Sequence, residues 1–147
     1  MALAKDFFTT DQLDDLKQVI QNAELDTSGE IRLHIENKCN GDVMDRAAFI
    51  FEKLEMNKTN LRNGVLFYLA IKNRKFAIIG DVGINNMVPD DFWEKIKHKM
   101  LNQFRENMFY EGLCEGVQKA GEQLKKHFPH QMDDVNELPD EISFGDN

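Results

Sequence analysis

The stretch that decides the fold spans residues 63–83 and reads NGVLFYLAIKNRKFAIIGDVG. Two apolar runs, residues 65–71 and 76–79, flank a polar break at residues 72–75. Apolar side chains at successive positions are typical of strands that are covered on both faces. The stretch therefore predicts a β-hairpin in a sheet with helices on both sides, which is a three-layer α/β/α sandwich.

A βαβ unit is predicted ahead of this hairpin. Residues 30–36 alternate polar and apolar side chains, which predicts a strand with one buried face. Residues 43–54 carry apolar side chains at helical spacing, and Asp42 can cap that helix. The order strand, helix, strand favours parallel first and second strands with a right-handed crossover. The βαβ unit and the hairpin together predict a small mixed sheet.

Three further helices complete the predicted domain. The first begins after Thr9 or Thr10 and ends near Asp26, the next opens at residues 89–91, and the last runs from about residue 110 to 127. Beyond Pro129 the chain becomes acidic and irregular. We expect a single domain over residues 1–128 and an acidic C-terminal tail over residues 129–147, either docked at two points or disordered.

Composition excludes several classes of protein. The chain of 147 residues has 26 acidic and 18 basic side chains and a formal net charge of −8. Nucleic-acid binding relies on basic patches, so DNA and RNA are not expected as partners. The longest apolar run is about eight residues, whereas a membrane helix needs ~20, and residues 1–6 lack a signal-peptide core. We therefore expect a cytoplasmic protein without membrane insertion.

The sequence lacks the common catalytic and cofactor motifs. It contains no GxSxG nucleophile motif, no phosphate-binding GxxxxGK[ST] and no GxGxxG after a strand. No nucleotide or organic cofactor is expected. Cys39 and Cys114 form no CxxC pair and are predicted to be ordinary thiols. His34 is predicted to take part in a polar ladder with Arg32 and Glu36, on the same side of its strand.

The remaining candidates for chemistry are three acids and two arginines. Asp81 leaves the sheet between two glycines, and Asp90 and Asp91 follow shortly after. Carboxylates suit Ca²⁺ or Mg²⁺, but Asp81 can equally bond its own turn, and Asp90 or Asp91 can cap a helix. Arg74 reads as a hairpin tip or an anion-binding group. Arg105 reads as a charge that meets the negative end of a helix.

Several short motifs resemble those of the TPM domain family. They are Asn63-Gly64-Val65-Leu66, Arg74-Lys75, Gly80, Gly83-Ile84, Phe104-Arg105 and Phe109-Tyr110-x-Gly112. That family includes acid-phosphatase-like proteins of the thylakoid lumen that are linked to photosystem II repair, and an accessory protein of nematode acetylcholine receptors. The resemblance implies an α/β/α sandwich, divalent-cation binding and a weak phosphatase activity.

This chain departs from the family at positions where many members carry acids. Asn63, Asn73 and Asn85 stand there instead, and an amide neither transfers protons nor supplies an anionic ligand. The resemblance then leaves Asp81 and Asp90 as candidate metal ligands and Asp91 and Arg105 as candidate catalytic residues. Asn63 and Arg74 remain as candidate binding residues.

Two hypotheses follow. The first is a weak divalent-metal-dependent phosphatase that acts on phosphomonoesters with Ca²⁺ or Mg²⁺. The second is a non-catalytic domain for protein interaction, in assembly or repair, whose acids serve as turn and cap residues.

Overall fold

The computed structural model describes residues 6–129 and 142–145, and a four-stranded sheet lies at its centre. The strand order is β3-β2-β1-β4. β1 (Glu30–Glu36) and β2 (Gly64–Ala70) are parallel, and β3 (Lys75–Gly80) runs antiparallel to β2. β4 (Ser143–Phe144) pairs in parallel with the other edge of β1. The predicted βαβ unit, hairpin and mixed sheet are confirmed.

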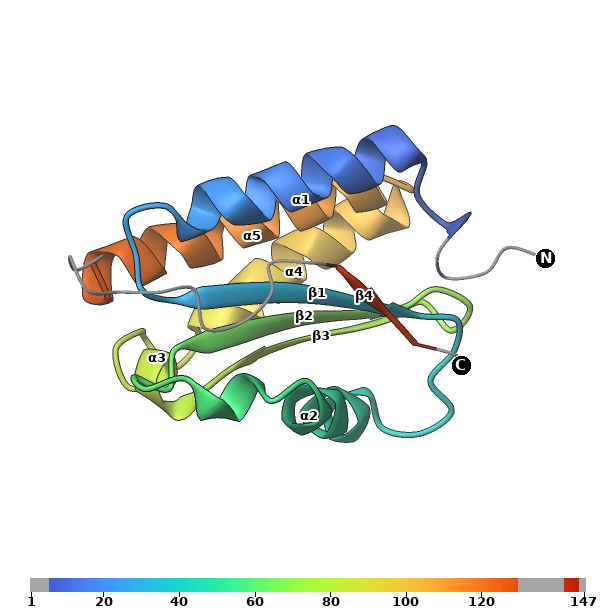
Figure 1. Ribbon diagram of the computed structural model, residues 1–147. Helices are drawn as coiled ribbons and strands as arrows, with labels where there is room; N and C mark the ends of the chain where they lie inside the picture. The colour runs from blue at the N-terminus through green and yellow to red at the C-terminus, as the bar shows by residue number, and fades with distance from the viewer. Residues whose placement is uncertain (1–5, 130–141, 146–147) are drawn as a thin grey trace.

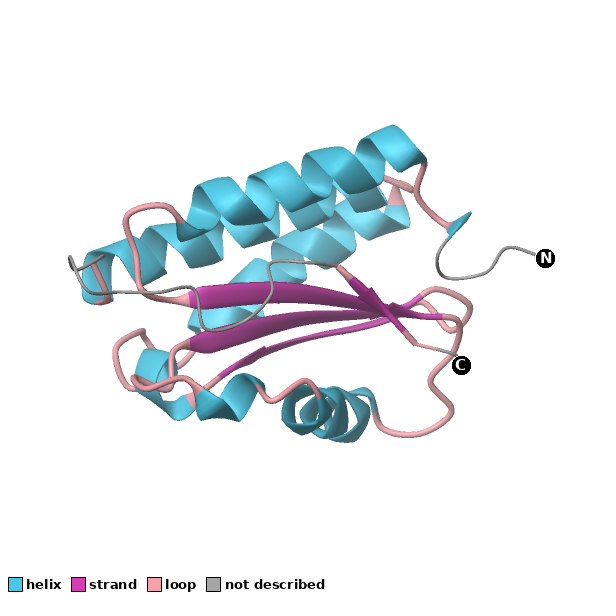
Figure 2. Cartoon of the chain, in the orientation of Figure 1, coloured by secondary structure: helices cyan, strands magenta, loops and turns pink. Residues whose placement is uncertain are grey.

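Helices cover both faces of this sheet (Figures 1 and 2). One face carries α1 (Thr10–Glu24), α4 (Phe92–Arg105) and α5 (Phe109–His127). The opposite face carries α2 (Val43–Lys53) and the short 3₁₀ helix η2 (Met56–Lys58), and α3 (Val82–Asn85) follows β3 at the end of the sheet. The three-layer α/β/α sandwich predicted from residues 63–83 is therefore confirmed.

Each face of the sheet has its own hydrophobic core. The larger core joins the sheet to the three long helices and includes Leu16, Ile20, Phe67 and Leu124. The smaller core joins the sheet to α2 and includes Tyr68. Alternate side chains of β2 enter the two cores, so all seven of its residues are buried. This double burial explains the apolar run that predicted the strand.

The prediction that β1 has one buried face is wrong. Glu30, His34 and Glu36 are only 3%, 5% and 0% exposed, although they occupy the polar positions of the alternation. Arg46 of α2 and Tyr68 of β2 bind Glu36 on this face, and His34 contacts the same carboxylate, so these buried polar groups are hydrogen-bonded. Alternation reports the polarity of side chains and says nothing of whether water reaches them.

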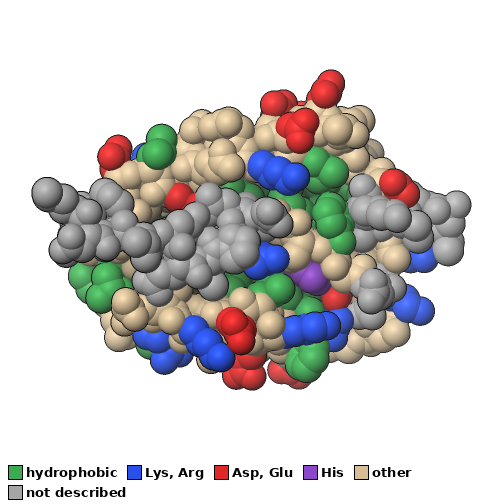
Figure 3. All heavy atoms as spheres, in the orientation of Figure 1, with side chains coloured by type: hydrophobic (Ala, Val, Ile, Leu, Met, Phe, Trp, Pro, Cys, Tyr) green, Lys and Arg blue, Asp and Glu red, His purple; other side chains and the backbone are tan. Residues whose placement is uncertain are grey.

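The helix ends follow from local chemistry. Thr9 and Gln12 form a reciprocal capping box at the start of α1, and Asp42 accepts hydrogen bonds from two backbone N–H groups at the start of α2. The exposed Asp11, Asp14 and Asp15 put negative charge on the outer surface of α1 (Figure 3). Within the described residues, no helix is long and apolar enough to cross a membrane.

Part of the predicted acidic tail is described. Ile142 is 7% exposed in the larger core, and Ser143 and Phe144 form β4. The other tail residues, 130–141 and 146–147, lie outside the described residues.

Candidate functional site

Four of the predicted site residues lie at the end of the sheet where β1 and β2 begin, an end that we call the edge of the acids. They are Asn63, Asp81, Asp90 and Asp91. Gly80 pairs with Val65, so Asp81 leaves β3 at this edge, next to Asn63. The indole Nε1–H of Trp93, in the first turn of α4, donates to Asn85 Oδ1 at 2.7 Å. This bond holds the start of α4, with Asp90 and Asp91, at the same edge.

The two predicted arginines lie at the opposite edge. Arg74 sits in the turn between β2 and β3, where its guanidinium lies 5.9 Å from the ring centroid of Phe109. Arg105 ends α4, which Asp91 precedes, so about 20 Å of helix separates the two side chains at ~1.5 Å per residue. The structure thus places the acids and Asn63 at one end of the sheet, and neither of the two predicted arginines lies there.

Asp81 is bound to Arg62, a residue that the sequence reasoning missed. Arg62 Nε donates to Asp81 Oδ2 at 2.7 Å, and Arg62 Nη2 donates to Oδ1 at 2.9 Å. The backbone N–H of Val82 also donates to Oδ1, at 2.8 Å. The hydrogen bonds to Asp81 raise the pKa of Arg62. Asp81, with a side chain only 5% exposed, therefore fixes the turn into α3.

These contacts decide how well the edge suits a metal ion. A divalent cation at Asp81 would compete with Arg62 for both carboxylate oxygens. Among the residues that the structure describes, no group of three or more His, Cys, Asp or Glu could hold a metal. In this arrangement the residues do not fit a resident Ca²⁺ or Mg²⁺.

The other predicted residues of this edge also have structural contacts. Asn63 is 1% exposed, its backbone N–H donates to Thr59 Oγ1, and its side-chain amide donates to Ser28 Oγ at 3.3 Å. Asp91 precedes α4 without a side-chain capping bond and pairs with Lys95 at 3.2 Å. Asp90 is exposed beside it.

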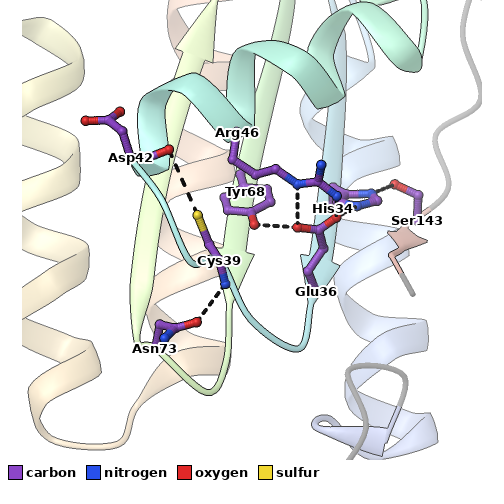
Figure 4. Close-up of polar contacts among 8 residues, drawn as sticks. All are labelled: His34, Glu36, Cys39, Asp42, Arg46, Tyr68, Asn73 and Ser143. Carbon is purple, nitrogen blue, oxygen red and sulfur yellow. Dashed lines mark hydrogen bonds and ion pairs between the residues drawn. The ribbon is translucent and has the colours of Figure 1, made fainter. Parts of the chain in front are cut away.

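A second polar cluster lies toward the opposite edge, around Glu36 (Figure 4). We call His34, Glu36, Arg46, Tyr68 and Ser143 the Glu36 cluster. Arg46 donates to Glu36 Oε2 from Nε at 3.0 Å and to Oε1 from Nη2 at 2.6 Å. The Tyr68 hydroxyl donates to Oε2 at 2.5 Å, and His34 Nε2 lies 3.3 Å from Oε1. Glu36, though fully buried, is thus paired on both oxygens.

Burial and pairing shift the pKa values within the cluster. Burial lowers the pKa of His34, and the neighbouring Glu36 only partly offsets it. Burial alone would raise the pKa of Glu36, but hydrogen bonds from Arg46 and Tyr68 outweigh it and hold that pKa below its ordinary value. Burial and the bond to Glu36 raise the pKa of Tyr68. The cluster therefore holds a charged carboxylate beside a neutral imidazole and a neutral phenol.

The cluster borders an open surface pocket of about 520 Å³, lined by residues 38–42, 45 and 46. Cys39 in this lining is 4% exposed, and its backbone N–H donates to Asn73 Oδ1 at 2.6 Å. Its thiol contacts the carbonyl oxygen of Gly41 at 3.6 Å. Asn73 thus holds the loop that carries Cys39 (Figure 4).

Comparisons with known proteins agree with this architecture. The TPM domain family matches residues 3–123. The solution structure of the BA42 protein from the psychrophilic bacterium Bizionia argentinensis is 43% identical and superposes with a TM-score of 0.89. The alignment covers 99% of this chain and 100% of BA42. The chain therefore belongs to the TPM domain family, as the motifs of its sequence had suggested.

Two more distant structures share the fold. The N-terminal domain of a protein from P. gingivalis is 20% identical with a TM-score of 0.70, over 84% of this chain and 82% of that one. The N-terminal domain of the cg2496 protein from Corynebacterium glutamicum is 8% identical with a TM-score of 0.64, over 96% and 83%. No curated protein matches the sequence.

Proposed function

We propose that this TPM domain acts by binding a protein partner, in assembly or repair, rather than by catalytic turnover. One observation carries the proposal: both oxygens of the Asp81 carboxylate are held by Arg62, and one of them also by the backbone of Val82. The strongest candidate for chemistry is thus a structural residue. Arg74 and Arg105 support the same proposal, because both lie away from the acids. Among the described arginines, only Arg62 is paired with Asp81.

A weak divalent-metal-dependent phosphatase that acts on phosphomonoesters is the second candidate. Two observations favour it. The chain is a member of the TPM family, and Asp81 shares one edge of the sheet with Asp90 and Asp91. This function requires Arg62 to leave Asp81, so that the carboxylate could face a cation.

A calorimetric titration with Ca²⁺ and Mg²⁺ separates the two candidates. The full chain, Asp81→Asn and Arg62→Gln are titrated in parallel, and each is assayed with an aryl phosphate. If Asp81 is structural, none of the three binds metal saturably at millimolar concentration, and none turns over substrate. If Asp81 is a ligand, the full chain binds one ion, Asp81→Asn does not, and Arg62→Gln binds more tightly because its competitor is gone.

The binding function itself is tested by affinity capture with the full chain, followed by direct titration of each recovered protein. We expect at least one partner with a saturable one-to-one affinity. Phosphatase turnover that is lost in Asp81→Asn, with no such partner, would refute the proposal.

A further inference from the structure

Residues 142–145 dock on the outer edge of β1, and three of these four residues each make a different kind of contact with the rest of the domain. Ile142 is buried in the larger core, and Ser143 Oγ lies 2.6 Å from His34 Nδ1. The backbone N–H of Gly145 donates to the carbonyl oxygen of Ile35 at 2.9 Å. Phe144, between them, is 38% exposed. The segment therefore presents the pattern aliphatic, serine, any residue, glycine.

The serine position is specified by the Glu36 cluster. A carboxylate only accepts hydrogen bonds, so Nε2 of the neutral His34 ring carries the proton that faces Glu36, and Nδ1 is left as an acceptor. The Ser143 hydroxyl donates to it (Figure 4). Without a hydroxyl at this position, Nδ1 of a side chain that is 6% exposed would lose its partner.

Glycine is required at position 145 because Glu36 leaves no room there for a side chain. A Cβ added at Gly145 would come within 2.5 Å of Glu36 Cγ. Glu36 is held in place by Arg46 and Tyr68, so it has no room to give way. Any side chain larger than a hydrogen atom would push the segment off the edge of β1.

We propose that the outer edge of β1 is a recognition site for extended peptides of the pattern aliphatic–Ser–x–Gly. Residues 142–145 are its resident occupant, and a partner protein carries the same pattern and replaces them by adding a strand to the sheet. This inference rests on the proposed protein-binding function and names its surface. β4 is two residues long, so few backbone bonds must break for the exchange.

Peptide titration of the full chain tests the site. The probe is a synthetic peptide of residues 141–147, Glu-Ile-Ser-Phe-Gly-Asp-Asn, added to ¹⁵N-labelled protein. Gly145→Val releases the resident segment. Gly41→Val is the matched control, because a Cβ at Gly41 meets nothing within 4 Å. The readouts are the amide shift of Ile35 and the imidazole shifts of His34.

We expect saturable binding to Gly145→Val, with shifts at Ile35 and His34. Binding to the wild type and to Gly41→Val should be at least about tenfold weaker, because the tethered segment competes at a high effective concentration. Peptides with alanine in place of the serine or valine in place of the glycine should bind Gly145→Val at least about tenfold more weakly. If Gly145→Val fails to fold, Ser143→Val releases the segment instead, since it removes the hydroxyl that donates to His34 Nδ1 and puts a branched apolar side chain in its place.

The proposal is overturned if the released chain folds but binds no peptide at millimolar concentration. It is also overturned if the altered peptides bind as well as the original. If either result is obtained and affinity capture with the full chain still recovers a partner, the protein-binding function stands, but the partner binds a different surface. Failure of that function would show instead in the metal titration and the phosphatase assay.

Discussion

At the scale of single residues, Glu36 is a buried charge that its neighbours fully satisfy. A carboxylate removed from water is costly unless it is paired and hydrogen-bonded. Arg46 supplies the opposite charge in a two-pronged contact, and Tyr68 and His34 add further bonds. Removing any one of these partners should therefore lower the free energy of unfolding by itself.

Tyr68→Phe should destabilise the fold by about 2 kcal/mol, because it removes a hydrogen bond to a buried charge and leaves the ring in place. Urea unfolding followed by circular dichroism measures the loss. Tyr110→Phe is the control, since its hydroxyl reaches Asp15 at 3.2 Å on the surface, and it should cost less than about 0.5 kcal/mol. Equal losses in the two variants would contradict this account of Glu36.

The sequence located most side chains on the right element but missed their partners. Asp81 was identified as a turn residue or metal ligand, and its ion pair with Arg62 went unseen. The register of the hairpin could have revealed this ion pair. Because Val65 lies opposite Gly80, the residues just before β2, which include Arg62, must lie close to those just after β3, which include Asp81. Within the Glu36 cluster, only the pairing of His34 with Glu36 was predicted, from the alternation of β1. Arg46, Tyr68 and Ser143 left no such signal, because they come from α2, β2 and β4, and an alternating strand looks the same whether its polar face is wet or buried.

At the scale of elements, α3 is held against the loop before β2 by contacts between backbones. The N–H of Gly83 donates to the carbonyl oxygen of Arg62 at 2.8 Å. A Cβ at Gly83 would collide with the carbonyl oxygens of Leu61 and Arg62. Glycine is needed here for the closeness of the approach.

Gly83→Ala should cost about 3 kcal/mol, at the upper end for overpacking, because the obstacle is backbone rather than a flexible side chain. Gly41→Ala, with open space around the added methyl group, should change stability by less than about 0.5 kcal/mol. Thermal and urea unfolding of both variants give the comparison. A Gly83→Ala protein as stable as Gly41→Ala would rule out the close packing of α3.

The long elements were predictable because each carries its own signal. Thr9 and Asp42 mark helix starts by capping chemistry, and β2 shows its double burial as an unbroken apolar run. α3 was missed because four residues are too few to show a helical period. β4 was missed as a strand because its two residues take their structure from the edge of β1.

At the scale of the whole molecule, acid should weaken the fold in two stages. Burial lowers the pKa of His34 in the folded protein, so the unfolded chain takes up this proton at higher pH. Stability should therefore begin to fall as the pH drops below the ordinary value of 6.5. The pKa of Glu36 is also lower in the folded protein, so a second loss should follow below 4.5.

Urea unfolding at pH values on either side of 6.5 and of 4.5 checks both stages. His34→Gln should abolish the first stage and keep the second. A wild-type protein whose stability is constant from pH 7 down to 4.5 would show that His34 is not held neutral.

The packing of α1 on α5 joins segments from opposite ends of the described domain. Gly121 of α5 lies so close to α1 that an added Cβ would come within 2.7 Å of Ala23 Cβ. About 100 residues separate the starts of the two helices, which a ribosome adds in roughly 5–20 s. During that time the apolar stripe of α1, with Leu16 and Ile20, has left the ribosome without its final cover. A nascent chain of this protein therefore exposes the apolar stripe of its first helix until the fifth has emerged.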